Sequence, residues 1–212
     1  DIDFIVHTII ESDKSSTDTI SAVNIFSIPL DEYREVLRKI LLENIEDNEY
    51  WLSGYLVAEY EGKVVGALSS WIEERDGLSN ALIKSNLLME FVDKEKLVKR
   101  GKELELIQSL TFERTTKSIQ LEYGFVSEEF RRRGIFTKLI QSHLKLRLNE
   151  STEIVCAQSI IYPDNIKSFN ALLKVGFHIK VDKIYDDDEI LKYFGLRLRK
   201  TLKRGLSGVP DA

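Results

Sequence analysis

The chain has 212 residues, and because a domain takes roughly 150 residues, we expect one domain with an insertion or extension. Hydrophobic residues make up 43% of it, enough for a packed core, and only 3 prolines and 11 glycines exclude a collagen-like or low-complexity chain. The net charge of −5 argues against sequence-independent binding of nucleic acid, although a local basic patch could still hold a small polyanion.

The chain contains one cysteine, which excludes an internal disulfide framework and a cysteine-based zinc site. Cys156 stands among apolar residues, so we interpret it as a buried thiol and not as a nucleophile. No run of about 18 apolar residues predicts a membrane span, and the first residues show no signal peptide. We therefore expect a cytoplasmic protein with neither a membrane nor a nucleic acid as partner.

The first third of the chain predicts a strand, a helix and a hairpin. Phe4–Ile10 is rich in β-branched residues and predicts a first strand, followed by a polar loop over Glu11–Ser21. Apolar residues then recur at helical spacing from Asp31 to Ile45. Two strand-like runs, Tyr50–Tyr60 and Lys63–Glu73, flank a glycine-containing turn and predict a hairpin.

The segment Asp76–Lys117 is longer than a simple connection between strands and predicts one or two helices. Its apolar residues, which include Leu82, Leu87 and Phe91 before Gly101 and Leu104 after it, are separated by many lysines and glutamates. The rest of the chain predicts, in order, a strand over Ser118–Val126, a helix over Gly134–Leu148, a strand over Glu153–Ile161, a helix capped by Asp164 and Asn165 and ended by Gly176, a strand over Phe177–Tyr185, an acidic turn over Asp186–Glu189 and a strand over Tyr193–Leu202.

The connection after the strand that ends at Val126 carries three consecutive arginines, Arg131 to Arg133, followed by Gly134 and an amphipathic helix. The first backbone N–H groups of a helix lack internal partners and lie at the positive end of its dipole, so an anion can bind there. The arginines add charge, and glycine lets a phosphate approach the backbone. By itself this pattern fits a phosphate site or a solvated surface turn.

A second segment, from Asn165 to Phe177, follows another strand, and together the two segments resemble the GNAT N-acetyltransferase superfamily. The first segment resembles the family's pyrophosphate loop, Q/R-x-x-G-x-G/A, with Arg131, Gly134 and Phe136 at the defined positions. The second resembles its N-x-x-S-x-x-x-Y-x-K-x-G-F segment, with matches at Asn165, Ser168, Lys174, Gly176 and Phe177.

The resemblance implies an α/β fold with a central mixed, mostly antiparallel sheet and helices on both faces. It also implies a V-shaped splay between two parallel strands, Leu121–Val126 and Ile154–Ile160, and a helical insertion between the third and fourth strands. We expect a single GNAT-like domain over residues 1–204 with the insertion at about 76–117, and a tail over residues 205–212.

For the cofactor, the resemblance implies acetyl-CoA as co-substrate and no metal. Its pantetheine arm would pair with the strand near Phe125 and Val126, and its diphosphate would meet the following loop. The cofactor-binding residues that we predict are Phe125, Val126, Arg131, Arg132, Arg133, Gly134, Ile135, Phe136, Asn165 and Ser168.

Two residues depart from the family pattern. Phe136 replaces the usual glycine or alanine, so its ring must point away from the diphosphate. Leu172 stands where many members carry a tyrosine that protonates the leaving thiolate. The binding prediction is therefore better founded than the standard catalytic one.

Our candidate general base is Glu122, on the strand that would meet the thioester; the alternative is an exposed or salt-bridged glutamate. Gln120 shares its face by the period of two, whereas Tyr123 should point to the other face. Tyr162 is the candidate general acid, and a packed tyrosine beside Pro163 is the alternative. The single histidines and the acidic turn over Asp186–Glu189 lack the spacing of a metal site.

We therefore predict acetyl transfer from acetyl-CoA to a primary amine of a small molecule or peptide by direct attack. The alternatives are a non-catalytic acyl-CoA-binding or interaction module, which Leu172 favours slightly, and a phosphate-binding α/β protein unrelated to CoA. The inserted segment could cover the acceptor site, form the contact of a homodimer, or have no role.

Overall fold

The computed structural model describes residues 1–14, 19–93, 95, 112–162, 165–184 and 198–205. Its centre is a six-stranded sheet with the strand order β1-β2-β3-β4-β6-β5. The strands are β1 (Tyr55–Tyr60), β2 (Lys63–Ile72), β3 (Ile119–Val126), β4 (Cys156–Ile161), β5 (His178–Ile184) and β6 (Leu198–Gly205). The mixed α/β fold predicted from the sequence is confirmed.

One strand pair of the sheet is parallel, β3 with β4, and the other neighbouring strands pair antiparallel. The ladder between β3 and β4 joins Ile119 to Ala157 and Gln120 to Gln158, near the start of both strands. Further along, the Ser159 hydroxyl donates to the Leu121 carbonyl at 2.8 Å. The short ladder agrees with the predicted splay, which itself stays a prediction.

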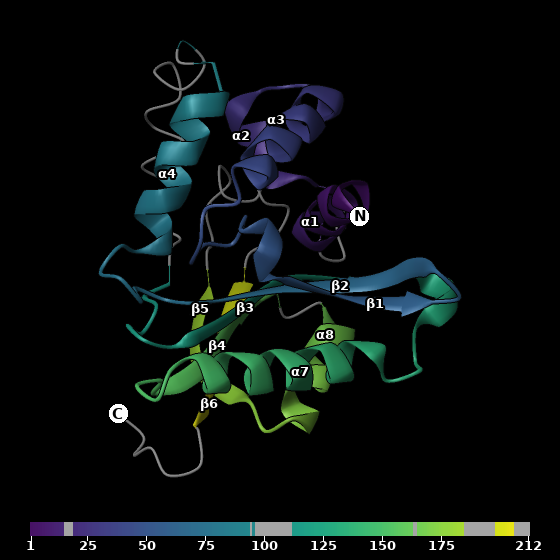
Figure 1. Ribbon diagram of the computed structural model, residues 1–212, viewed down its shortest axis with the longest axis vertical. Coiled ribbons are helices and arrows are strands. Elements are labelled where there is room, and N and C mark those ends of the chain that lie inside the picture. The colour runs from purple at the N-terminus through teal and green to yellow at the C-terminus, as the bar shows by residue number, and fades with distance from the viewer. Residues whose placement is uncertain (15–18, 94, 96–111, 163–164, 185–197, 206–212) are drawn as a thin grey trace.

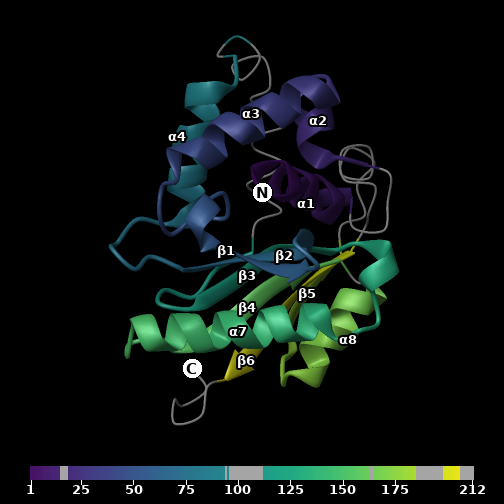
Figure 2. The ribbon, with the colours of Figure 1, turned by 45° about the vertical axis from the view of Figure 1, so that its right-hand side comes forward.

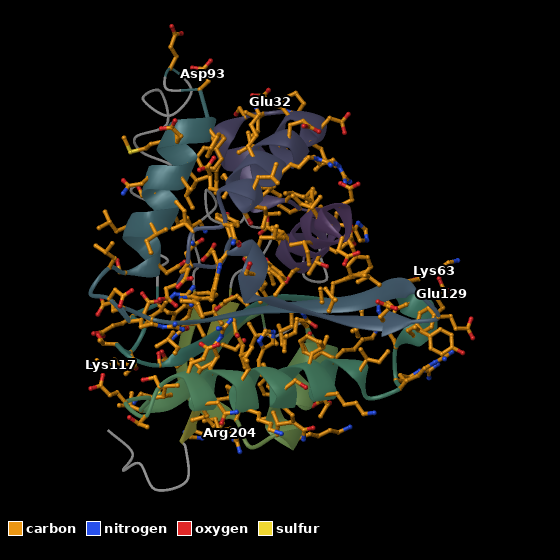
Figure 3. All side chains as sticks on the ribbon, in the orientation of Figure 1. Glu32, Lys63, Asp93, Lys117, Glu129 and Arg204 are labelled. Carbon is orange, nitrogen blue, oxygen red and sulfur yellow. The ribbon has the colours of Figure 1, made fainter. Side chains whose placement is uncertain are left out.

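Helices cover both faces of the sheet (Figures 1 and 2). On one face lie α1 (Ile2–Lys14), α2 (Ser21–Phe26), α3 (Leu30–Glu43) and α4 (Asn80–Phe91), and on the other lie α7 (Ile135–Glu150) and α8 (Ile166–Lys174). Each face has its own apolar core, one among α1 to α4 and one under α7 and α8. Figure 3 shows side chains filling both layers.

The prediction of a first strand over Phe4–Ile10 is wrong, because this segment belongs to helix α1. The prediction relied on β-branched residues, but Ile5, Val6, Ile9 and Ile10 are buried at helical spacing, on one face packed against the sheet and α3. Burial of that face outweighs the weak strand preference of the individual residues. The predicted loop after it is also wrong in part, since α1 continues to Lys14 and α2 begins at Ser21.

The inserted segment contains helix α4, which confirms the helical prediction for its first part. The predicted helical residues from Leu97 to Leu110 lie outside the described residues, as do the acidic turn over Asp186–Glu189 and residues 206–212 of the predicted tail, whose first residue, Gly205, ends β6. Because the chain begins with a helix, the insertion lies between β2 and β3, the second and third strands, and not between the third and fourth. Glu73 and Lys117 are joined by a backbone hydrogen bond of 2.7 Å, so the two ends of the insertion lie side by side.

Helix α7 is fixed to the sheet by a buried chain of hydrogen bonds. The Nε2–H of His143 donates to the Leu68 carbonyl at 2.6 Å, which leaves Nδ1 to accept from the Ser70 hydroxyl, also at 2.6 Å. Arg147 donates to the Ser70 hydroxyl and carbonyl. Burial, despite the bond to Leu68, lowers the pKa of His143 to about 4, so the imidazole is neutral near pH 7.

Candidate functional site

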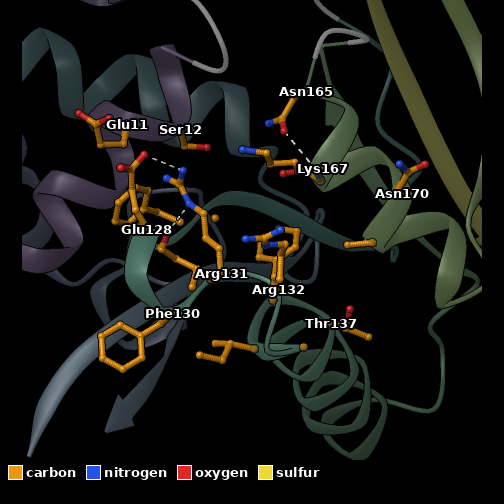
Figure 4. A pocket seen from close by; sticks show the side chains of 18 of the residues that line it. Glu11, Ser12, Glu128, Phe130, Arg131, Arg132, Thr137, Asn165, Lys167 and Asn170 are labelled. Atoms are coloured by element: carbon orange, nitrogen blue, oxygen red, sulfur yellow. Dashed lines mark hydrogen bonds and ion pairs between the residues drawn. The ribbon is translucent and has the colours of Figure 1, made fainter.

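A large cavity of about 1280 Å³, here called the first cavity, lies where β3 ends and where α7 and α8 begin (Figure 4). It is also lined by the C-terminal part of α1. The structure brings together around it nine of the ten residues predicted to contact a cofactor: Phe125, Val126, Arg131, Arg132, Gly134, Ile135, Phe136, Asn165 and Ser168. Segments about thirty residues apart thus form one site.

The start of α7 forms the backbone part of the first cavity. Gly134 is the N-cap residue with φ 78°, a left-handed conformation that side chains disfavour. The Lys138 N–H makes a helical bond back to the Gly134 carbonyl at 3.0 Å, so the amides of Ile135, Phe136 and Thr137 precede the first intrahelical bond. This end of the helix can therefore donate to an anion.

The three arginines of the loop have three different positions. Arg131 donates through Nε to the Val126 carbonyl and through Nη1 to Glu128, both at 2.9 Å, so it holds the loop against β3 (Figure 4). Arg132 lines the cavity, and its backbone has a positive φ of 63°. Arg133 is not among the described lining residues, and its guanidinium lies 5.0 Å from the Phe130 ring. The arginines therefore act separately and not as one cluster.

Helix α8 contributes the other wall. The Asn165 side chain accepts from the Ser168 N–H at 3.2 Å, which confirms that Asn165 caps the helix. Gly176, at φ 89°, ends it as predicted, with the Phe177 N–H bonded to the Leu172 carbonyl. Lys167 also lines this cavity and was not predicted to do so, although it lies inside the second motif.

The first cavity has an excess of positive charge although the whole chain is acidic. Of its described lining residues, Lys14 pairs with Glu11 and Arg131 pairs with Glu128. The excess therefore comes from Arg132, in the loop before α7, and from Lys167 and Lys174, near the two ends of α8. A lining with this excess charge attracts an anionic ligand.

A second cavity of about 170 Å³ lies between the C-terminal halves of β3 and β4. Both predicted catalytic residues, Glu122 and Tyr162, line it. Five residues line both cavities and mark their junction: Ser12, Gly124, Phe136, Asn165 and Ser168. A ligand that fills the first cavity could therefore extend to the second.

A bulge in β3 shapes the second cavity. Ala67 pairs with Phe125 and Ser69 with Glu122, so Tyr123 and Gly124 together face the single Leu68. Tyr123 has φ 46°, and its side chain packs against the core that contains residues of α1 and α3. The expectation that Tyr123 points away from Glu122 is therefore wrong, because the bulge breaks the alternation and both residues line the cavity.

A buried network that was not predicted from the sequence surrounds Glu49, which also lines the second cavity. The Glu49 carboxylate accepts from Lys84 at 2.5 Å, from Tyr123 at 3.0 Å and from Asn80 at 3.0 Å. Burial opposes ionisation of Glu49, but Lys84 and Arg114 outweigh burial and hold its pKa at about 2. No spacing rule in the sequence joins these residues, which come from four separate segments.

Arg114 connects this network to Glu122. Its Nη1 donates to Gln120 at 2.8 Å and to Glu122 at 3.3 Å, and its Nη2 lies 3.7 Å from Glu49. Glu122 Oε1 also accepts from the Ile160 N–H at 3.2 Å. Gln120 and Glu122 thus share a face, as predicted, and Glu122 is a salt-bridged glutamate positioned at the cavity between the two strands.

The two departures from the family pattern, Phe136 and Leu172, both line the second cavity. Leu172 is buried and lines the second cavity with its apolar side chain. The Phe136 ring packs on Gly124: a Cβ added there would lie 2.9 Å from Cζ of the ring and closer still to Cε2. Gly124 therefore provides the space that the ring fills, and the ring rests on the sheet.

The cysteine and two of the histidines considered from the sequence lie in packed or hydrogen-bonded environments. Cys156 is buried, as predicted. The His7 ring packs edge-on against Phe125 at 4.9 Å, and His143 belongs to the chain of bonds under α7. Among the described residues, no three His, Cys, Asp or Glu side chains gather as metal ligands would. No helix in the described part of the chain is long and apolar enough to span a bilayer.

Comparison with known proteins gives a consistent result. The model of the acetyltransferase (GNAT) family matches residues 22–177. Among solved structures, a protein described as an acetyltransferase superposes with a TM-score of 0.59 at 14% identity, over 97% of this chain and 93% of the other. An N-acetyltransferase from Staphylococcus aureus Mu50 superposes with a TM-score of 0.57 at 20% identity, over 83% and 82%.

The ribosomal-protein-alanine N-acetyltransferase from Brucella melitensis superposes with a TM-score of 0.55 at 15% identity, over 97% of this chain and 94% of the other. At these identities the likeness shows the fold alone. No sequence among curated proteins matches this chain.

Proposed function

Because the chain belongs to the acetyltransferase (GNAT) family, we propose that it transfers an acetyl group from acetyl-CoA to a primary amine. Family membership and fold support acyl transfer in general. The observation that carries the finer proposal is the junction of the two cavities, where the start of α7, with its unbonded amides, lies next to a cavity lined by Glu122 and Tyr162.

In this proposal the first cavity binds the donor. The amides at the start of α7, with Arg132, Lys167 and Lys174, would hold its phosphate groups. The end of β3 near Phe125 and Val126 would pair with the pantetheine arm. CoA fits this cavity because its charge is negative and the excess charge of the lining is positive. When bound, the cofactor supplies an activated acyl thioester.

The second cavity would admit the amine. Glu122 would take the proton from the attacking nitrogen, directly or through a water. Tyr162 would protonate the thiolate, since Leu172 offers no hydroxyl. Tyr123 is a poor acid by comparison, because burial and then the Glu49 carboxylate raise its pKa well above the usual value.

Donor binding is tested by isothermal titration of the full chain with CoA. We expect binding, and a loss of at least tenfold in affinity for Gly134→Leu, whose side chain would enter the first cavity. Gly77→Leu is the matched control, since Gly77 has a similar left-handed φ of 82° and lies between β2 and α4. No heat and no thermal shift at millimolar CoA would exclude the proposal.

Catalysis is tested by thiol release from acetyl-CoA over a panel of amines. Turnover that falls about a hundredfold or more in Glu122→Gln would support the enzyme. Tight CoA binding without turnover on any amine would instead support a non-catalytic acyl-CoA-binding module, which Leu172 favours. Binding of nucleotides in place of CoA would indicate a phosphate-binding protein of a different kind.

A further inference from the structure

The second cavity has two chemically different ends. Toward α1 and α4 its lining is charged, with Asp13, Glu49, Lys84 and Arg114. Toward α7 and α8 its lining is apolar: Leu68, Leu121, Phe136, Ile140, Ile161 and Leu172, all of which belong to or pack against the core under these two helices. The cavity therefore reaches from one face of the sheet toward the other.

Phe136 is the residue of the apolar end that also lines the first cavity. Its ring occupies the place of a side chain at Gly124 and lies next to Leu68. Because Leu121, Ile140 and Leu172 are almost fully buried around it, the apolar end has little space of its own. The position of one ring thus decides how far an apolar group can enter from the junction.

We propose that the apolar end of the second cavity is the subsite for the acyl chain of the donor, and that Phe136 restricts this chain to acetyl length. This inference rests on the proposed function. The donor would reach the junction along β3, so that its acyl group lies beside Gly124 and faces the ring. The charged end then remains for the amine, and each end binds one reactant.

The structure gives the reason why this residue, and not a neighbour, sets the limit. The other apolar residues of the subsite belong to the sheet or to the middle of α7 and α8, where they support the core. Phe136 lies in the first turn of α7, is half-buried and faces both cavities. Truncating it would join the space of its ring to the second cavity.

The test is the ratio of dissociation constants for acetyl-CoA and butyryl-CoA, measured by titration calorimetry on the full chain, which needs no amine. We expect the wild type to bind butyryl-CoA no tighter than acetyl-CoA. In Phe136→Ala the ratio should move by about tenfold in favour of butyryl-CoA, because each buried methylene contributes about fourfold in affinity. Phe136→Leu should move it less and keeps the helix packed.

Phe169→Ala is the matched control. Phe169 lies on α8 and packs against the same core, but it is not among the described residues that line either cavity. Its ratio should equal that of the wild type. If CoA and acetyl-CoA bind but the ratio does not change in Phe136→Ala and Phe136→Leu, the subsite is wrong while the proposed function stands. If CoA itself does not bind the wild type, both fail.

Discussion

The two cavities differ in how the chain builds them. The first is formed largely by two short segments, each a loop followed by a helix, and basic side chains outnumber acidic ones in its lining. The second joins side chains from α1, the residues before β1, α4, Arg114, β3 and β4, and its charges are paired inside the protein. Short sequence motifs therefore indicate most residues of the first cavity, whereas the residues of the second come from distant segments that no single motif joins.

The largest expected effect is on the second cavity. Glu49→Gln would leave Lys84 and Arg114 without their shared buried anion, so the free energy of unfolding should fall by about 3 kcal/mol or more. Urea unfolding measures this loss. Glu46→Gln, an exposed neighbour, is the control and should change stability by less than about 0.5 kcal/mol. A loss for Glu49→Gln no larger than that of the control would show that the network is not stabilising.

Lowering the pH should weaken the His143 hydrogen bonds under α7 before it weakens the Glu49 network. The folded pKa of His143 is about 4 against an ordinary value of 6.5, so the unfolded chain takes up its proton first. Its contribution of roughly 3 kcal/mol is complete above pH 6.5 and is lost as the pH falls toward 4. The pKa of Glu49 is about 2 against 4.5, so its contribution is lost only below pH 4.5.

The free energy of unfolding, measured at several pH values from 7.5 to 4.5, covers the range in which the His143 contribution is lost. His143→Gln, which keeps a donor and an acceptor on the side chain, should remove most of the pH dependence there. A variant with the same slope as the wild type would assign the dependence to other groups.

The junction of the cavities is tested by Gly124→Ala. The added methyl group would collide with the Phe136 ring and should cost about 1–3 kcal/mol of stability. In a Phe136→Ala background the same substitution should cost much less, because the ring is gone. A double-mutant cycle measured by chemical unfolding gives the coupling, and additive costs would contradict the packing of the ring on Gly124.

The smallest expected effect concerns two neighbouring arginines of the loop before α7, of which Arg132 lines the first cavity and Arg133 does not. Arg132→Gln should weaken CoA binding by about threefold at low salt and by less at high salt, since it removes one exposed charge from the lining. Arg133→Gln should have almost no effect, because Arg133 lies over the Phe130 ring. Equal losses for the two variants would mean that only net charge matters.

The sequence predicted much of the second half of the fold. The strands around β3 and β4, the helices α7 and α8 and the caps at Asn165 and Gly176 follow from apolar spacing and from residues that act locally. Because these signals lie within one or two turns of the chain, nine of the ten predicted cofactor contacts lie around one cavity. Arg133 is the exception, since a run of three identical residues does not indicate which of them turns inward.

The tertiary structure alone decided three other features. Phe4–Ile10 became a helix because its apolar face packs on the sheet, which outweighs the strand preference of β-branched residues. Tyr123 joined Glu122 on one face because of a bulge that the strand pattern does not show. Glu49, Lys84 and Arg114 met only through folding, since their attraction acts between segments far apart in the chain. Helix caps and amphipathic spacing depend on neighbouring residues, so the sequence predicts them. Burial and charge pairing depend on residues that are distant in the chain, so only the tertiary structure shows them.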